Sequence, residues 1–361
     1  MSIESDLKKD GIKVLDKLDE LVVNTIARNI ARKLVATFPE IHFDETNLYI
    51  KLSRINMYTA DMPNGMAEAN YFYKNSSIYF NNEIDVEDLE DFAIHECIHH
   101  IQEIKDKSNR LLRMGLCTFT HLKPFGIGLN EAAVQYITSK VIGIKPDYVK
   151  YYGIDMKTSS PCYYPVECNL LEQINFLIGE EATLDSTFHS NNHFKNLFES
   201  IFSKKVYDAV VNAFDYILNC EEKIIIQNNL LQEIDEHTKK VDKILGQINV
   251  LKEQISTTYM RTQNLIFTTY FDNTFNQITD LEGLDNFRRK LDEYRNYIGR
   301  ADGYYYFDNY YTEKMCALEH KCNILENGGL ETAIETPSVN KIVAIFNKIK
   351  EFFLKEHKYS E

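Results

Sequence analysis

The stretch "DFAIHECIHHIQ" (residues 91–102) places three histidines and a glutamate in a mostly apolar segment with helical spacing. Within it, His95, Glu96 and His99 form the pattern HExxH. An α-helix has about 3.6 residues per turn, so His95 and His99 lie on one face and can direct two imidazole nitrogens at one metal ion. Glu96 lies beside that face, within reach of a water on the metal. His100 points about 100° away from His99 and is expected to make a hydrogen bond instead.

A metal site of this kind needs a further ligand, and "GIGLNEAAVQY" (residues 126–136) contains a candidate. Glu131 lies 32 residues after His99, in the first turn of the next expected helix, and would bring a carboxylate from a second rigid element. A third histidine close behind is excluded, because the pattern HExxHxxGxxH needs a glycine and a histidine where this chain has Gln102 and Lys105. One zinc ion suits the resulting set of two imidazoles and a carboxylate.

HExxH on one helix followed by "NEA" on the next resembles the gluzincin metallopeptidases of the thermolysin-like clan, over about residues 45–200. The resemblance implies a catalytic zinc with His95, His99 and Glu131 as its ligands and Glu96 as the general base. It also implies a zincin-like fold, in which a small edge-stranded sheet lies over the HExxH helix. The substrate it implies is a protein or peptide.

Two features depart from that family. Its members carry an Asp four residues beyond the glutamate ligand, whereas this chain has Gln135, whose carbonyl can accept the imidazole N–H without adding charge. No residue is marked as the donor to the transition state, so Tyr163, Tyr164, His193 and His121 are candidates. Each of them also suits a surface or packing role. Tyr164 is preferred, because a loop before a helix lets its side chain enter from the opposite wall.

The apolar spacing around these motifs predicts a helix-rich α+β fold. β-Branched and aromatic residues gather early in the chain, where a hairpin forms the only sheet expected. Asp85 is the expected N-cap of the HExxH helix, with Asp88 at the capping-box position. Gly126 and Gly128 would allow a close approach before the second helix, and Asn130 would cap it. The expected elements are an amphipathic helix over 5–37, strands over 47–58, 68–74 and 76–82, and helices over 85–102, 129–142, 166–179 and 193–202.

A long helix is expected between about residues 230 and 265, where isoleucine and valine recur at heptad spacing. A coiled coil between chains and a helical hairpin within one chain both remain open, because His237 and Thr258 interrupt the seam, and the hairpin is favoured. The shift to an all-helical pattern predicts a zincin-like domain over 1–204 and an all-helical domain over 205–361. The heptad positions are Ile234, Val241, Ile248 and Ile255.

The composition narrows the class of protein. A net charge of -14 disfavours a nucleic-acid partner, which would need clustered Lys and Arg. The seven cysteines are scattered without CxxC spacing, so reduced thiols are expected rather than a disulfide scaffold or a thiolate metal site. No secretory leader and no stretch of membrane-spanning length is evident, which predicts a cytoplasmic protein without a membrane partner.

The predicted function is zinc-dependent hydrolysis of peptide bonds, with Glu96 as general base and Tyr164 as the donor to the transition state. An alternative from another class is an inactive or structural metal-binding core whose C-terminal helices contact a protein partner. A purely structural helical protein without a metal is the third possibility. The first two differ in whether the metal keeps a coordination position open to water, because four protein ligands close a structural site.

Overall fold

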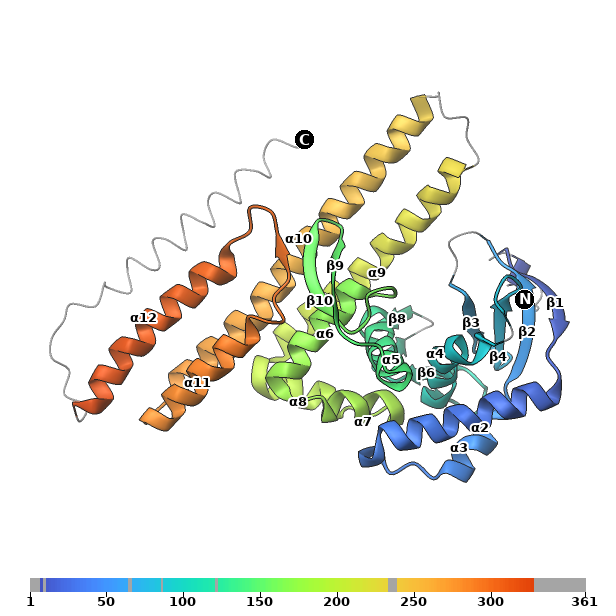
Figure 1. Cartoon of the computed structure of the whole chain (residues 1–361), viewed down its shortest axis with the longest axis horizontal. Coiled ribbons are helices and arrows are strands. Elements are labelled where there is room, and N and C mark those ends of the chain that lie inside the picture. The colour runs from blue at the N-terminus through green and yellow to red at the C-terminus, as the bar shows by residue number, and fades with distance from the viewer. Residues whose placement is uncertain are drawn as a thin grey trace.

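The computed structural model describes residues 7–8, 11–63, 67–85, 87–120, 123–232 and 239–327. Within them the chain forms helices α2 to α12 and three small sheets (Figure 1). This confirms the helix-rich α+β class predicted from the sequence. In the same part of the chain, no helix combines the length and the apolar character needed to cross a bilayer.

The first sheet is mixed and packs against α2 (Glu20–Thr37) and α4 (Leu89–Gln102). Its antiparallel hairpin, β3 with β4, confirms the predicted one, whereas β2 pairs with β4 in parallel. Met57, Ile78 and Phe80 fill the interior between sheet and helices. β3 forms one edge of the sheet. The strand order is β1 (Lys13–Lys17), β2 (Asn56–Asp61), β4 (Ser77–Asn81), β3 (Ala69–Phe72).

The prediction of one amphipathic helix over 5–37 is wrong in its N-terminal part. Residues 7–8 are helical as predicted, but β1 covers Lys13–Lys17, and α2 begins only after Asp19, whose carboxylate accepts a hydrogen bond from the Leu21 backbone N–H at 2.7 Å. Such a cap satisfies one of the unpaired N–H groups of the first turn and so sets the start of the helix. Residues 1–6 and 9–10 of the prediction lie outside the described chain.

The strand predicted over 47–58 is also mostly helix. α3 (Glu45–Leu52) follows α2 through the short 3-10 turn η1 (Pro39–Ile41). Asp44 caps α3, because its carboxylate accepts from the Asn47 backbone N–H at 2.7 Å. This cap and the burial of Leu48 and Leu52, four residues apart, outweigh the β propensity of the segment. Only its end, in β2, is a strand.

Two further sheets contradict the expectation of a single early sheet. Their strands are short and mix polar with apolar residues, so they lack the long alternation that identifies a strand in a sequence. The turn between β6 and β7 depends on Gly115, which has φ +55° and lies against the side chains of Gln102 and Asn130. The second sheet has the order β5 (Glu103–Lys105), β6 (Leu111–Met114), β7 (Cys117–Thr120), β8 (Lys123–Phe125), and the third β11 (Arg300–Ala301), β10 (Ile154–Thr158), β9 (Asp147–Tyr151).

The HExxH helix α4 lies centrally between the first sheet and α5 (Ile127–Ile142), as Figure 1 shows. Its predicted cap by Asp85 is wrong. Asp88 occupies the N-cap position without a capping side-chain bond, and its backbone N–H bonds to the Asp85 carbonyl in a turn. Ile94 and Ile98 are fully buried, so α4 is held by its apolar face.

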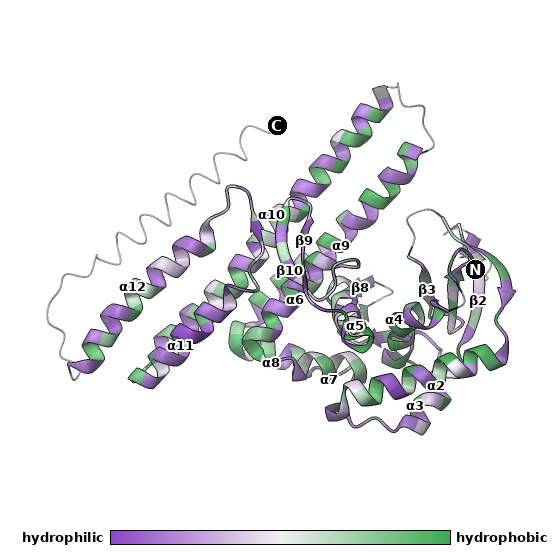
Figure 2. Cartoon of the chain, viewed as in Figure 1, coloured by the Kyte–Doolittle hydropathy of each residue, from purple (hydrophilic) through white to green (hydrophobic). Residues whose placement is uncertain are grey.

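The helices after α5 confirm the predicted helical pattern, and α9 and α10 confirm the predicted hairpin within the chain. Ile248 and Ile255 of the heptad series are buried in it, whereas Ile234 and His237 lie outside the described residues. The far ends of the hairpin extend away from the rest of the chain, with hydrophobic and hydrophilic residues alternating along them (Figures 1 and 2). These helices are α6 (Pro165–Ile178), α7 (Glu181–His189), α8 (His193–Phe202), α9 (Lys204–Gln232), α10 (Lys239–Gln277), α11 (Leu281–Tyr294) and α12 (Tyr306–Glu326).

One hydrophobic core spans the predicted domain boundary at residue 205. It joins Leu170 and Phe198 on one side of the boundary to Val211 and Phe267 on the other. A second core lies between the first sheet, α2 and α4. The division into domains 1–204 and 205–361 stays a prediction, and across this boundary α9 packs against α5 and α10 packs against α6.

The start of α5 is fixed by α9. The Asp215 carboxylate accepts hydrogen bonds from the backbone N–H groups of Gly126 and Gly128 at 2.8 and 2.9 Å, which satisfies the N-terminus of α5 from a neighbouring helix. The predicted capping role of Asn130 is wrong. Asn130 lies buried within α5, where its side chain accepts from the Leu116 backbone N–H at 3.0 Å.

Gly128 provides a test of this packing. A Cβ at Gly128 would lie 2.4 Å from the Phe214 carbonyl oxygen in α9, so Gly128→Ala forces the two helices apart. We expect Gly128→Ala to lower the free energy of unfolding by about 2 kcal/mol or more. Gly246→Ala in α10 is the matched control, because a Cβ there meets nothing within 4 Å and alanine favours the helix by up to about 1 kcal/mol. Urea denaturation of both variants measures the difference, and equal stabilities would contradict the described packing.

Candidate metal centre

Three side chains converge where α4 packs against α5. Glu131 Oε2 lies 3.2 Å from His95 Nε2 and 3.4 Å from His99 Nε2, and the two Nε2 atoms are 3.0 Å apart. The ligand atoms all lie within 4.8 Å of one another. The predicted ligands are thus brought together from two helices, each of which is anchored by a buried face.

The chemistry of this group fits a zinc ion. Two imidazole nitrogens at 3.0 Å cannot both present lone pairs to each other unless a proton or a cation lies between them. A zinc ion at about 2.0–2.2 Å from each donor would satisfy both nitrogens and the carboxylate together. Among the described residues, the group contains His95, His99 and Glu131 and no fourth His, Cys, Asp or Glu. Three protein ligands are typical of sites that keep a position for water or substrate.

The neighbouring histidines keep Glu131 charged despite its burial. Burial favours the neutral form of Glu131, but the neighbouring His99 and His95 outweigh it and hold the pKa of Glu131 well below its usual range. Burial also disfavours a charged His99, yet Glu131 raises the pKa of His99 above its ordinary value. The carboxylate is therefore ionised at neutral pH, as a metal ligand must be.

Gln135 is hydrogen-bonded to Nδ1 of His95, the ring nitrogen that does not face the other ligands. His95 Nδ1 lies 3.0 Å from Gln135 Oε1, and Gln135 in turn donates to Ser139 Oγ at 3.4 Å. An acceptor at Nδ1 fixes the proton on that nitrogen and leaves Nε2 to bind a metal. Gln135 makes the hydrogen bond predicted for it without a negative charge.

The carboxylate of Glu96 is buried next to the ligands and held by the edge strand β3. Glu96 Oε2 accepts a hydrogen bond from the Tyr71 backbone N–H at 2.7 Å. Burial is the main cause that raises the pKa of Glu96 to about 7, with Glu131 adding to the shift and His95 opposing it. The Tyr71 hydroxyl lies 2.7 Å from His100 Nδ1, so His100 belongs to this supporting network rather than to the ligand group.

A cavity of about 120 Å³ opens beside His95 and Glu96. Tyr164 lines it, and its ring stacks on the His95 imidazole with centroids 6.2 Å apart. Tyr164 has φ +48°, a strained conformation for a tyrosine, immediately before Pro165 begins α6. Burial, followed by the carboxylates of Glu131 and Glu96, raises the pKa of Tyr164 well above its usual value, so the phenol stays protonated.

The other donor candidates lie elsewhere or outside the described chain. Tyr163 lines the same cavity but is exposed and interacts with Glu68. His193 Nδ1 lies 2.9 Å from Asp185 Oδ2 on the surface, and His193 does not line the cavity. His121 lies outside the described residues. Tyr164 is therefore the candidate whose ring contacts a ligand.

Sequence reasoning missed a pair of carboxyl groups close to Tyr164. Glu167 of α6 is fully buried, and neither of its carboxyl oxygens has a hydrogen-bond donor among the described residues. Burial is the main cause that raises the pKa of Glu167 well above its usual value, and the nearby Glu221 carboxyl of α9 adds to the shift. Burial raises the pKa of Glu221 to about 7. The two groups therefore influence each other's titration, and nothing in the spacing of two distant glutamates indicates it.

This pair predicts how stability depends on pH. The folded-state pKa of Glu221 is raised above that of the unfolded chain, so the stability that goes with its protonated form is complete below about pH 4 and is lost as pH rises through about 7. Glu221→Gln keeps a hydrogen-bonding group and removes this titration. Between pH 5 and 8 the free energy of unfolding of the native protein should fall by roughly 2 kcal/mol more than that of Glu221→Gln.

Urea denaturation across this pH range measures the difference, with Glu253→Gln at an exposed position of α10 as the charge control. Glu253→Gln should follow the native protein. Parallel curves for the native protein and Glu221→Gln would contradict the raised pKa of Glu221.

All seven cysteines are free, and four of them (Cys97, Cys117, Cys168 and Cys220) are buried, which agrees with the predicted absence of a disulfide scaffold.

The proposed function rests on the geometry of the site, because comparison with known proteins found no match. No protein-family model, no curated protein sequence and no solved structure matches this chain.

Proposed function

We propose that the protein hydrolyses peptide bonds in a zinc-dependent reaction, as a gluzincin-type metallopeptidase. The observation that carries this proposal is the convergence of two Nε2 atoms of α4 and one carboxylate oxygen of α5, with the buried carboxylate of Glu96 beside them. Zinc, when bound by His95, His99 and Glu131, supplies a Lewis acid that polarises a carbonyl and acidifies a water.

Four residues of the chain have roles in the proposed reaction. Glu96 takes a proton from the attacking water at its carboxylate and returns it to the leaving amine. A pKa of about 7 suits both transfers near neutral pH. The Tyr71 backbone N–H holds Glu96 in place, and Gln135 fixes the tautomer of His95. The protonated Tyr164 donates a hydrogen bond to the oxyanion of the tetrahedral intermediate.

The zincin-like arrangement of sheet and helix is part of the same proposal. β3 is an edge strand, and the backbone of Tyr71 in β3 reaches Glu96 on α4. Ala69 of β3 also lines the cavity beside the ligands. A polypeptide substrate in extended form suits a cavity bordered by a strand edge.

A second candidate is a metal-binding core that serves as a protein-interaction module without catalysis. The observation that favours it is the α9–α10 hairpin, which extends from the body and carries exposed apolar residues such as Ile226 and Val250. In that case the protein would bind zinc without cleaving peptides, so replacing Glu96 would have no catalytic effect.

Replacing the proposed base tests the reaction. Glu96→Gln should leave zinc content unchanged, because Glu96 is not a ligand, and should lower the cleavage rate of fluorescein-labelled casein by about 10³-fold or more. Glu253→Gln serves as the surface control and should keep full activity. Undiminished cleavage by Glu96→Gln would show that another group is the base, and zinc binding without any cleavage by the native protein would favour the interaction module.

The role of Tyr164 is tested by removing one hydroxyl. Tyr164→Phe keeps the ring on His95 and removes the donor, so kcat on casein should fall by about 10²–10³-fold while KM and zinc content stay unchanged. Tyr163→Phe is the matched control on the neighbouring, exposed ring. Loss of kcat in the Tyr163 variant instead of the Tyr164 variant would reassign the donor.

A further inference from the structure

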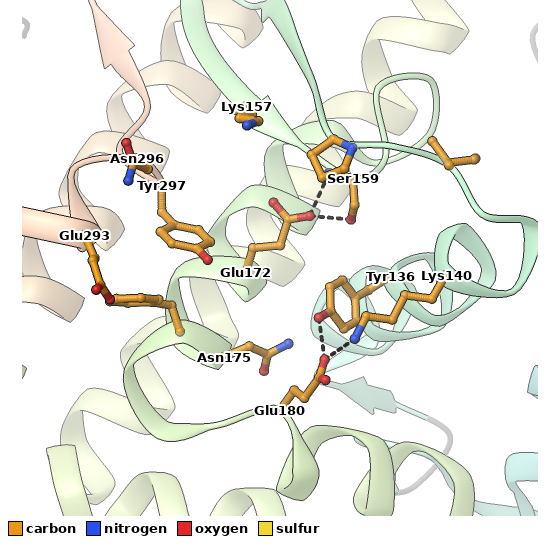
Figure 3. Close-up of a pocket in the computed structure, with 13 residues that line it drawn as sticks. Tyr136, Lys140, Lys157, Ser159, Glu172, Asn175, Glu180, Glu293, Asn296 and Tyr297 are labelled. Atoms are coloured by element: carbon orange, nitrogen blue, oxygen red, sulfur yellow. Dashed lines mark hydrogen bonds and ion pairs between the residues drawn. The ribbon is translucent and has the colours of Figure 1, made fainter. Parts of the chain in front are cut away.

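A second and larger cavity lies beside α5 and α6. Its volume is about 610 Å³, within the range of about 300–1,000 Å³ typical of ligand sites. It is lined by Tyr136 and Lys140 of α5, Glu172 of α6 and Tyr297 after α11, among others (Figure 3). Acidic and aromatic side chains therefore meet around one space.

One wall of the cavity already holds a cation of the chain itself. The Lys140 ammonium lies 4.8 Å from the centroid of the Tyr136 ring and is paired with the Glu180 carboxylate. The Tyr136 hydroxyl donates to the same carboxylate at 2.6 Å. An ammonium between a ring face and a carboxylate is stabilised by both, through the negative face of the ring and through the ion pair.

Glu172 offers a second carboxylate without such a cation. The residue is only 9% exposed, and the donors from Ser159 and Thr158 all reach its Oε1, including the Ser159 backbone N–H at 2.8 Å. Within the described part of the chain, its Oε2 receives no hydrogen bond. Oε2 is not one of the fully enclosed polar atoms, and Figure 3 shows it turned away from Ser159, so an occupant of the cavity can reach it.

The charge of this carboxylate is only partly compensated by the chain. Burial disfavours the charged form and raises the pKa of Glu172, and the donors from Ser159 and Thr158 and the charge of Lys140 oppose this shift without cancelling it. A buried carboxylate is unfavourable until a cation is paired with it. The cavity therefore lacks a positive charge at Oε2.

An aromatic wall stands beside Glu172. The rings of Phe176 and Tyr297 are 4.7 Å apart, and both line the cavity. Burial and then the Glu172 carboxylate raise the pKa of Tyr297, so this ring and the carboxylate are neighbours. The Lys290 ammonium lies 5.8 Å from the Phe176 centroid, whereas no cation of the described residues lies over Tyr297. Glu172 and Tyr297 thus repeat the carboxylate and the ring that surround the Lys140 ammonium, but without an ammonium.

An anionic occupant is disfavoured, because both lysines that line the cavity have partners. Lys140 is paired with Glu180. The Lys157 ammonium lies 5.6 Å from the centroid of the Tyr148 ring. An anion would meet the Glu172 carboxylate without a new cation to bind, so a positively charged occupant fits the cavity better.

We propose that this cavity binds an alkylammonium group, which forms an ion pair with Oε2 of Glu172 and lies against the ring of Tyr297. A lysine side chain of a polypeptide and a free alkylamine both carry this group. The inference does not depend on the proposed peptidase function, because neither zinc nor Glu96 takes part in the binding.

Calorimetric titration of the full chain measures this binding directly. The probes are n-pentylamine and N-acetyl-lysine methylamide, which carry the same ammonium, and 1-pentanol, which has a similar size and no charge. We expect pentylamine to bind about tenfold more tightly than pentanol, or better, because only the amine can pair with Glu172. The tighter of the two amines identifies the source of the group, a polypeptide or a free amine.

Three variants locate the bound ammonium. Glu172→Gln keeps an oxygen for the Ser159 donors and removes the charge, so it should weaken pentylamine binding by about tenfold and leave pentanol binding unchanged. Tyr297→Leu keeps an apolar side chain and removes the ring, so it should weaken pentylamine binding by about threefold. Glu253→Gln makes the same charge change as Glu172→Gln at an exposed position of α10 and should leave both affinities unchanged.

The outcomes decide the inference independently of any cleavage of casein. No measurable binding of either amine, equal affinities for pentylamine and pentanol, or unchanged pentylamine affinity in a folded Glu172→Gln variant would overturn the site. If Glu172→Gln does not fold, an unchanged pentylamine affinity in Tyr297→Leu overturns it instead. Amine binding that depends on Glu172 would uphold the site, even for a protein without peptidase activity.

Discussion

The structure depends on the burial of two imidazoles and a carboxylate at the contact between α4 and α5. Burial of ionisable groups is unfavourable unless they compensate one another, and here Glu131 is stabilised by His95 and His99 while it raises the pKa of His99. The close approach of the two Nε2 atoms is the feature for which we propose a bound zinc ion. The proposed chemistry, the cavity beside His95 and the supporting hydrogen bonds all follow from this one contact.

That contact is maintained by elements distant in sequence. Asp215 of α9 binds the first backbone N–H groups of α5, and Gly128 allows the two helices to touch. On the other side, β3 binds Glu96 through the backbone of Tyr71. The C-terminal helical region therefore contributes to the position of Glu131.

The parts of the fold that could be predicted are those with a strong local pattern. HExxH places two histidines on one helical face by spacing alone, and the heptad positions Ile248 and Ile255 indicate a long buried helix. The grouping of Glu131 with His95 and His99 was predicted because a metal site with two histidines needs a further ligand, and the next helix begins with a carboxylate.

The missed parts depend on local caps or on distant contacts. Asp44 starts a helix where β-branched and aromatic residues indicated a strand, because one side-chain bond to a backbone N–H outweighs a weak propensity. The strands β5 to β8 are too short for an alternating pattern. Glu167 lies on α6 and Glu221 on α9, and α7 and α8 come between them in the sequence, so only the folded chain brings their carboxyl groups together.

The central claim is most directly tested by X-ray absorption at the zinc K-edge of the zinc-loaded protein. The account predicts one zinc per chain with a shell of two imidazole nitrogens and light oxygen donors at about 2.0–2.2 Å, and loss of one oxygen donor and of zinc affinity in Glu131→Ala. A shell that contains sulfur or a third imidazole, or one that is unchanged in Glu131→Ala, would contradict it.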